Sequence, residues 1–125
     1  MKNEKFSIKK RAKSFIYAFD GIVALLRDEH NSRIHVFAMA IVIILGFLIG
    51  LTSTEWCIVA LCCGGVLMAE AMNSAVEAIA DLVSKEYNPL IKKAKDVGAA
   101  GVLIMAIAAA VAGIIIFIPK IIALF

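Results

Sequence analysis

The sequence predicts an all-α integral membrane protein, with an amphipathic helix at the membrane surface followed by three transmembrane helices. Of its 125 residues, 62% are hydrophobic and only 18% are charged, which is more apolar surface than a soluble domain of this size can bury. The basic residues are also segregated, since residues 34–83 contain no Lys or Arg. This layout is typical of a small membrane protein, and we expect one domain, residues 1–125.

The surface helix is predicted over residues 5–27. Apolar side chains recur there at steps of three and four and form one stripe. The stripe consists of Ile8, Ala12, Phe15, Phe19, Ile22 and Leu26. Basic side chains cluster near the start, at Lys9, Lys10, Arg11 and Lys13. A basic amphipathic helix of this kind lies flat among lipid headgroups, and its stripe can also pack on other helices.

Three apolar segments follow. Residues 34–51 contain no charge and reach about 27 Å as a helix, enough to cross the hydrocarbon core. After a short polar turn, residues 56–83 form a helix of roughly 42 Å, so we expect its far end to emerge from the membrane. Residues 84–96 are interpreted as a polar loop. Residues 97–118, rich in Gly and Ala, form the third span, which we expect Pro119 to end.

The basic residues also predict the orientation. The N-terminal arm and residues 84–96 carry twelve of the thirteen Lys and Arg, and the turn at 52–55 carries none. The N-terminus is therefore expected in the cytoplasm and the C-terminus outside. The net charge is +3, and the basic residues flank the apolar spans. This position suits contact with anionic lipid headgroups better than contact with nucleic acid. We expect the bilayer, and no nucleic acid, as a partner.

Acidic residues interrupt the second span in the stretch EAMNSAVEAIAD, residues 70–81. At 100° per residue, Asn73, Glu77 and Asp81 project from the same side of a helix as Glu70. An acid at mid-membrane costs about 2.5–3.5 kcal/mol, so such residues usually face a protein interior or a wet cavity and indicate function. The alternative is a set of satisfied hydrogen bonds between helices.

Two more polar clusters are expected at the same cytoplasmic rim. RDEHNSRIH precedes the first span and KKAKD precedes the third. They supply Asp28, Glu29, Asn31, Arg33, Lys95 and Asp96. Carboxylates from two helices together with a lysine suit a Mg²⁺-bound phosphate, although the chain has no Walker A motif or kinase glycine loop. His30 and His35 have no partners at metal-ligand spacing, which favours headgroup contact or packing.

Four motifs occur in an order typical of one family: SFxYAxxGI in 14–22, ExNxRIH in 29–35, ExxNSAxExxxD in 70–81 and AKD in 94–96. With these motifs the chain resembles the small prokaryotic diacylglycerol kinases and undecaprenol kinases. EW at 55–56, NPL at 88–90 and IFIPK at 116–120 look more like the undecaprenol kinase branch.

The resemblance implies an ATP-dependent lipid kinase of the bacterial inner membrane, a homotrimer with active sites shared between neighbours. Its phosphate acceptor would be the primary hydroxyl of undecaprenol, with diacylglycerol as the alternative. By resemblance, Glu70 is the catalytic base, and Glu29 and Glu77 hold Mg²⁺-ATP beside Asn73. The nucleotide side comprises Tyr17, Glu86, Tyr87, Asn88, Lys95 and Asp96, with either Lys10 or Arg11 also touching ATP. We expect Asn31 and Arg33 to contact the acceptor.

Two other classes of function compete with this interpretation. A small proton-coupled transporter needs only one intramembrane Glu, but it leaves the clusters at 29–33 and 95–96 unexplained. A lipid-binding scaffold is disfavoured by the cost of so many buried acids. ATP consumption that requires a long-chain alcohol separates the kinase from both.

Overall fold

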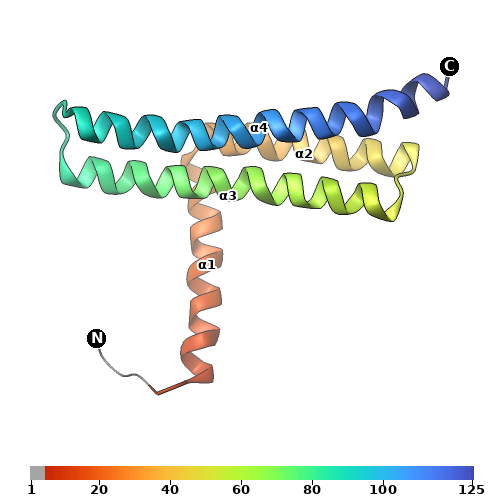
Figure 1. Ribbon diagram of the computed structural model, residues 1–125. Coiled ribbons are helices and arrows are strands. Elements are labelled where there is room, and N and C mark those ends of the chain that lie inside the picture. Colours follow the sequence, from red (N-terminus) through yellow and green to blue (C-terminus); the bar gives the residue numbers. More distant parts are fainter. Residues whose placement is uncertain (1–4) are drawn as a thin grey trace.

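The computed structural model describes residues 5–125, which contain four helices and no strand. These are α1 (Ile8–Asp28), α2 (His30–Ile49), α3 (Ser53–Val83) and α4 (Pro89–Ala123). Figure 1 shows α2, α3 and α4 side by side in one bundle, while α1 projects sideways from it. The predicted all-α architecture of one amphipathic helix and three long apolar helices is confirmed.

The break between α1 and α2 is a single residue. Glu29 has extended backbone angles, φ −113° and ψ 114°, so the chain changes direction there (Figure 1). The predicted start of the first span at residue 34 is four residues late, because the polar segment from His30 to Arg33 is already helical. At the other end Gly50 adopts φ 86°, a left-handed conformation that Gly tolerates best.

The start of α3 lies inside the predicted polar turn. Thr52 and Glu55 form a capping box: the Thr52 hydroxyl accepts from the Glu55 N–H at 3.2 Å, and the Glu55 carboxylate accepts from the Thr52 N–H at 2.9 Å. These bonds satisfy backbone donors that have no partner inside the helix. The helix therefore begins at Ser53, three residues before the predicted start.

Two expectations about α4 are wrong. Between α3 and α4 only residues 84–88 are non-helical, so most of the predicted loop belongs to α4. The Asn88 side chain caps the helix by accepting from the Leu90 N–H at 2.9 Å, and Pro89 occupies the first helical turn, where its missing N–H costs nothing. The helix also continues through Pro119 to Ala123. A proline removes one hydrogen bond, whereas in lipid every non-helical backbone group would need a partner.

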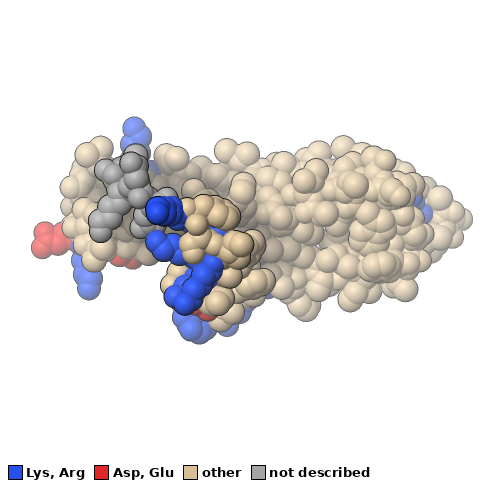
Figure 2. Space-filling view, turned by 90° about the horizontal axis from the view of Figure 1, so that it is seen from below, with Lys and Arg blue, Asp and Glu red and all other residues tan. Residues whose placement is uncertain are grey.

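The bundle has a thin core and an apolar exterior. Val59, Ile116 and Phe117 are buried near the end of the bundle that carries the α2–α3 turn, with Trp56 packed beside them. At this end Nζ of Lys120 lies 3.0 Å from Oε1 of Glu55. Most large apolar side chains are exposed, and α2, α3 and α4 are each long and apolar enough to cross a membrane. Figure 2 shows the corresponding uncharged surface, with Lys and Arg gathered mainly at α1 and the end beyond it.

Candidate active site

Glu70 is the most deeply buried acid of the described chain. Its exposed fraction is 3%, and its Oε1 lies 3.2 Å from Nε2 of His35, on α2. The atom makes no well-directed hydrogen bond within residues 5–125. The sequence predicts an inward-facing carboxyl here, and the structure agrees. Glu70 thus keeps accepting capacity at a position sealed from water.

One turn along α3, Asn73 and Glu77 form a pair. Nδ2 of Asn73 donates to Oε1 of Glu77 at 3.2 Å. On its other side, Oδ1 of Asn73 is buried with no partner in the described chain. It faces Gly98 of α4, where an added Cβ would lie only 2.6 Å from it. The absence of a side chain at Gly98 therefore makes the space that Asn73 occupies.

Glu29 joins this region from the α1–α2 break. Although it occupies the capping position of α2, its side chain makes no cap hydrogen bond. Its Oε1 instead accepts from the Ser74 hydroxyl at 2.9 Å. The extended backbone of Glu29 thus directs the carboxylate to α3, and two chain segments 45 residues apart meet at one level.

The contact between Glu29 and Ser74 provides a reference level along α3. It marks where α1, the amphipathic helix, joins the bundle (Figure 1). At 1.5 Å per residue, Glu70 lies about 6 Å deeper along α3 and Glu77 about 4.5 Å further out. From Ser74, α3 runs nine more residues to Val83, about 13.5 Å beyond this level.

Beyond Glu77, α3 and α4 are joined by an ion pair. Nζ of Lys95 lies 2.6 Å from Oδ1 of Asp81, and both side chains are partly exposed. Asp96 is paired with Lys92 on its own helix, at 2.5 Å. An exposed pair of this kind adds little stability.

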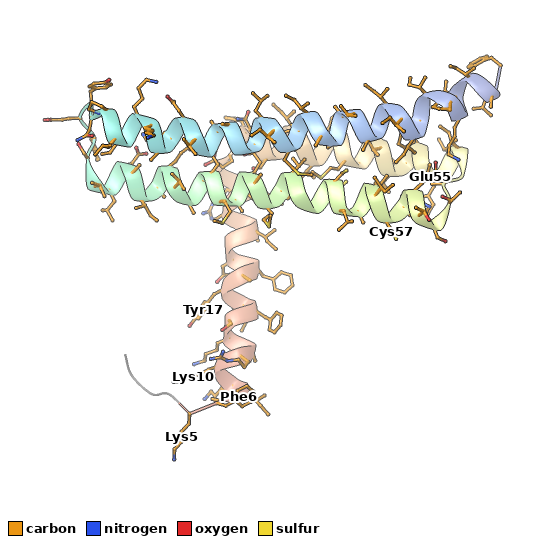
Figure 3. All side chains as sticks on the ribbon, viewed as in Figure 1. Lys5, Phe6, Lys10, Tyr17, Glu55 and Cys57 are labelled. Carbon is orange, nitrogen blue, oxygen red and sulfur yellow. The ribbon has the colours of Figure 1, made fainter. Side chains whose placement is uncertain are left out.

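Other predicted residues lie apart from this cluster. Figure 3 shows Lys10 and Tyr17 out along α1, away from the bundle. Residues 86–88 form part of the α3–α4 connection, where the Asn88 side chain is engaged in helix capping and Tyr87 is exposed. Within one chain, the structure does not bring these nucleotide-side residues to the buried acids.

The two predicted acceptor residues are also exposed, and neither is the α2 residue that touches Glu70. Arg33 lies 3.0 Å from the Nδ1 atom of His30 on its own helix, and Asn31 is exposed. The α2 residue in contact with Glu70 is His35. For His35 the sequence favours headgroup contact or packing, and in the structure this side chain packs against the buried carboxyl of Glu70.

Asp28, the other acid of the first polar cluster, is engaged elsewhere. It accepts from Nε of Arg27 at 2.9 Å, and this hydrogen bond keeps the pKa of Asp28 below its usual range. Both side chains are exposed. Asp28 therefore stays apart from the acids on α3, and Glu29 alone links the α1–α2 break to them.

The donor set fits a magnesium ion carried by phosphates better than a protein cage. Within residues 5–125, no three His, Cys, Asp or Glu side chains gather closely enough to hold a metal. Glu29 and Glu77 accept from the neutral groups of Ser74 and Asn73, and neither has an ion-pair partner in that part of the chain. Mg²⁺ usually takes one or two carboxylates together with phosphate oxygens and water.

Three residues outside the predicted site contact its members: His35, Ser74 and Gly98. Ser74 and Gly98 lie inside or next to the quoted motifs, beside predicted site residues. His35 and Glu70 lie on different helices, so only the relative register of α2 and α3 reveals their contact. Ser32 is fully buried and its hydroxyl has no partner in the described chain, a feature that no sequence signal shows.

Comparison with known proteins decides the family. The profile of the prokaryotic diacylglycerol kinase family matches residues 16–117. The chain belongs to the prokaryotic diacylglycerol kinase family. Members of this family are lipid kinases, so the protein is a membrane lipid kinase, and the transporter and scaffold alternatives are set aside.

Individual relatives of this lipid kinase agree with the family assignment. An undecaprenol kinase of Bacillus subtilis (strain 168) is 37% identical over 119 residues, which cover 95% of this chain and 97% of the relative. A diacylglycerol kinase of Synechocystis is 36% identical over 112 residues, 89% of this chain and 64% of the relative. A diacylglycerol kinase of Escherichia coli (strain K12) is 46% identical over 46 residues, 37% of this chain and 38% of the relative.

Proposed function

We propose that this lipid kinase transfers the γ-phosphate of Mg²⁺-ATP to the primary hydroxyl of undecaprenol or a similar polyprenol, and that it phosphorylates diacylglycerol less well. One observation carries the proposal: the buried carboxyl of Glu70 lies about 6 Å deeper along α3 than the contact between Glu29 and Ser74. A hydroxyl anchored in the membrane and a phosphate arriving from water can meet between these two levels.

Glu70 acts as the general base in this proposal. Its Oε1, which makes no well-directed hydrogen bond in the described chain, takes the proton from the acceptor hydroxyl as the hydroxyl oxygen bonds to the γ-phosphorus. The bond between that phosphorus and the oxygen bridging to the β-phosphate breaks, and ADP leaves with the electron pair. His35, 3.2 Å from Glu70, keeps the carboxyl in place. General-base assistance is typically worth 10²- to 10⁴-fold in rate.

The nucleotide side of the site is proposed around Glu29 and Glu77. These acids, which have only neutral hydrogen-bond donors in the described chain, would hold Mg²⁺ together with phosphate oxygens. When bound, Mg²⁺ neutralises charge on the transferring phosphate. Lys95 supplies a second positive charge once it leaves Asp81. Asn73 orients Glu77 through its amide.

The proposed assembly is a homotrimer with shared active sites. Its support is the position of α1, which carries Lys10 and Tyr17 away from the acids of its own bundle (Figure 3). In a trimer these residues can reach the nucleotide of a neighbouring subunit. We further propose that the N-terminus faces the cytoplasm, supported by the twelve Lys and Arg of the N-terminal arm and residues 84–96.

The acceptor assignment is tested by competition. The relative that this chain covers almost completely is an undecaprenol kinase, whereas the catalytic acids alone do not distinguish one primary hydroxyl from another. Purified protein should receive undecaprenol and diacylglycerol in one detergent, at several mole fractions, with labelled ATP. We expect faster turnover of undecaprenol. Diacylglycerol turnover about tenfold faster than that of undecaprenol would refute the polyprenol assignment and leave the lipid kinase assignment intact.

A further inference from the structure

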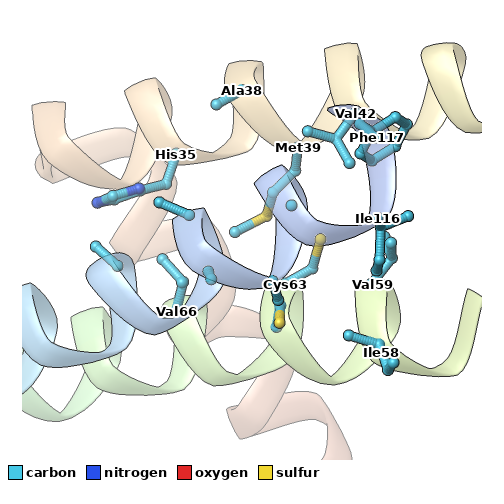
Figure 4. A pocket seen from close by; sticks show the side chains of 16 residues that line it. His35, Ala38, Met39, Val42, Ile58, Val59, Cys63, Val66, Ile116 and Phe117 are labelled. Carbon is cyan, nitrogen blue, oxygen red and sulfur yellow. The ribbon is translucent and has the colours of Figure 1, made fainter. Parts of the chain in front are cut away.

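A hollow lies between α2, α3 and α4, with His35 at one end. Its volume is about 290 Å³. Figure 4 shows His35 and Val66 toward one end and Ile116 and Phe117 toward the other. Along α3 the lining runs from Val66 to Ile58, about 12 Å, leading away from Glu70 toward the opposite face of the membrane.

Small side chains on α4 create this hollow. The helix contributes Ala106, Ala109 and Gly113 to the lining, and these residues leave unfilled the space between α4 and the other two helices. The hollow is half open, so it forms a groove along the bundle and not a sealed void. An apolar cavity of about 150 Å³ binds benzene, so this hollow has room for roughly two groups of five or six carbons.

The chemistry of the lining describes an amphiphile. His35 supplies the polar end, and its Nε2 lies 3.2 Å from the Glu70 carboxylate. The other lining residues are apolar side chains, Gly, or the thiols of Cys62 and Cys63. A molecule that fits has one polar group beside His35, the residue that contacts Glu70, and a hydrocarbon chain directed along α3. A primary alcohol with an apolar tail matches this description.

We propose that the hollow binds the first isoprene units of the acceptor alcohol and thereby places its hydroxyl at Glu70. This inference rests on the proposed function and adds the part of the site that holds the chain of the acceptor. An isoprenoid alcohol has one chain, which follows the cavity from the hydroxyl. A diacylglycerol has two chains, and a cavity of this volume takes only one of them. The second chain stays in the surrounding lipid, as do the later isoprene units of a polyprenol.

Filling the hollow tests the inference. Ala109→Leu places a larger side chain in the cavity, and Ala108→Leu is the matched control, since Ala108 is exposed on the same helix and does not line the cavity. Because a misfit in an apolar pocket typically costs about 10- to 200-fold, we expect Ala109→Leu to raise the KM for polyprenol roughly tenfold or more, with the KM for ATP unchanged. Ala108→Leu should stay within about twofold of wild type on the same scale. Equal polyprenol KM values in both variants would overturn the inference.

Photo-crosslinking provides a second test on the unaltered protein. A short isoprenoid alcohol with a diazirine near its tail is irradiated with the kinase in detergent, and labelled residues are mapped by mass spectrometry. Labels on Met39 and Cys63, displaced by undecaprenol, support the inference. Labels confined to exposed positions such as Cys57 would overturn it, because the hollow would then be filled by something else, such as a neighbouring subunit. Labels in the hollow that undecaprenol does not displace would also overturn it. Polyprenol phosphorylation by the same sample reports separately on the proposed function.

Discussion

Gly98→Ala is predicted to damage the site through a single added methyl group. The new Cβ would lie 2.6 Å from Oδ1 and 3.5 Å from Cγ of Asn73. The first distance is too short for real atoms, whereas the Asn73 Cα, 3.7 Å away, is in ordinary van der Waals contact, so the amide end of the Asn73 side chain has to move. Asn73 must therefore rotate, and its hydrogen bond to Glu77 is lost.

The magnitude follows from the two effects. Overpacking costs about 1–3 kcal/mol, and a lost hydrogen bond costs about 1 kcal/mol. We expect this energy to be lost from nucleotide binding, where each 1.4 kcal/mol changes the binding constant about tenfold. The value of kcat/KM for Mg²⁺-ATP should therefore decrease roughly tenfold or more. The measurement is initial-rate kinetics with ATP varied at saturating lipid.

Gly101→Ala is the matched control, because nothing lies within 4 Å of the added Cβ at Gly101, one turn further along α4. Replacing Gly by Ala in a helix is otherwise favourable by roughly 0.5–1 kcal/mol. Gly101→Ala should therefore keep normal kinetics. Equal ATP kinetics in the two variants would refute the reasoning about Asn73.

Three further predictions concern the nucleotide side and the helix ends. Glu29→Ala and Glu77→Ala should each weaken Mg²⁺-dependent ATP binding, measured by nucleotide titration with and without Mg²⁺. Unchanged metal dependence in both variants would place the metal elsewhere. Partial activity on mixing the two variants would support active sites shared between subunits. Lys95→Met should lower kcat/KM for ATP by about tenfold or more, whereas Asp81→Asn, which frees Lys95, should affect it less; the reverse order would argue against Lys95 as a phosphate ligand. Thr52→Ala removes the cap of α3 and should cost about 0.5–2 kcal/mol of stability. The variant should show a lower midpoint of thermal unfolding and normal kinase kinetics below that temperature. An unchanged midpoint would contradict the role of the cap.

The acidic face of α3 could be predicted because helix geometry alone determines it. Glu70, Asn73 and Glu77 share one side at 100° per residue, and α3 is continuous through all three. The same periodicity does not predict which residues of the other helices contact that side of α3. The contacts to His35 and Ser74 depend on the one-residue break at Glu29, whose effect on helix register has no sequence signal.

The errors at helix ends have a different cause. The polarity of residues 84–96 favours a loop, but the pair Asn88–Pro89 is a helix start signal, because Asn caps and Pro fits the first turn. Pro119 is an ordinary stop signal in water, whereas an apolar surrounding favours a continued helix over unpaired backbone groups. Local composition therefore locates the three long apolar helices and misjudges where they begin and end.

Glu70 is proposed to take the proton from a lipid hydroxyl. Glu70→Gln keeps the size of the side chain but cannot accept that proton. Single-turnover phosphorylation of undecaprenol, with labelled ATP prebound to wild type and variant, measures the chemical step directly. We predict that the variant's rate is reduced by about 100-fold or more, while its ATP affinity stays within roughly twofold of that of the wild type. A variant that keeps more than half of the wild-type rate would contradict it.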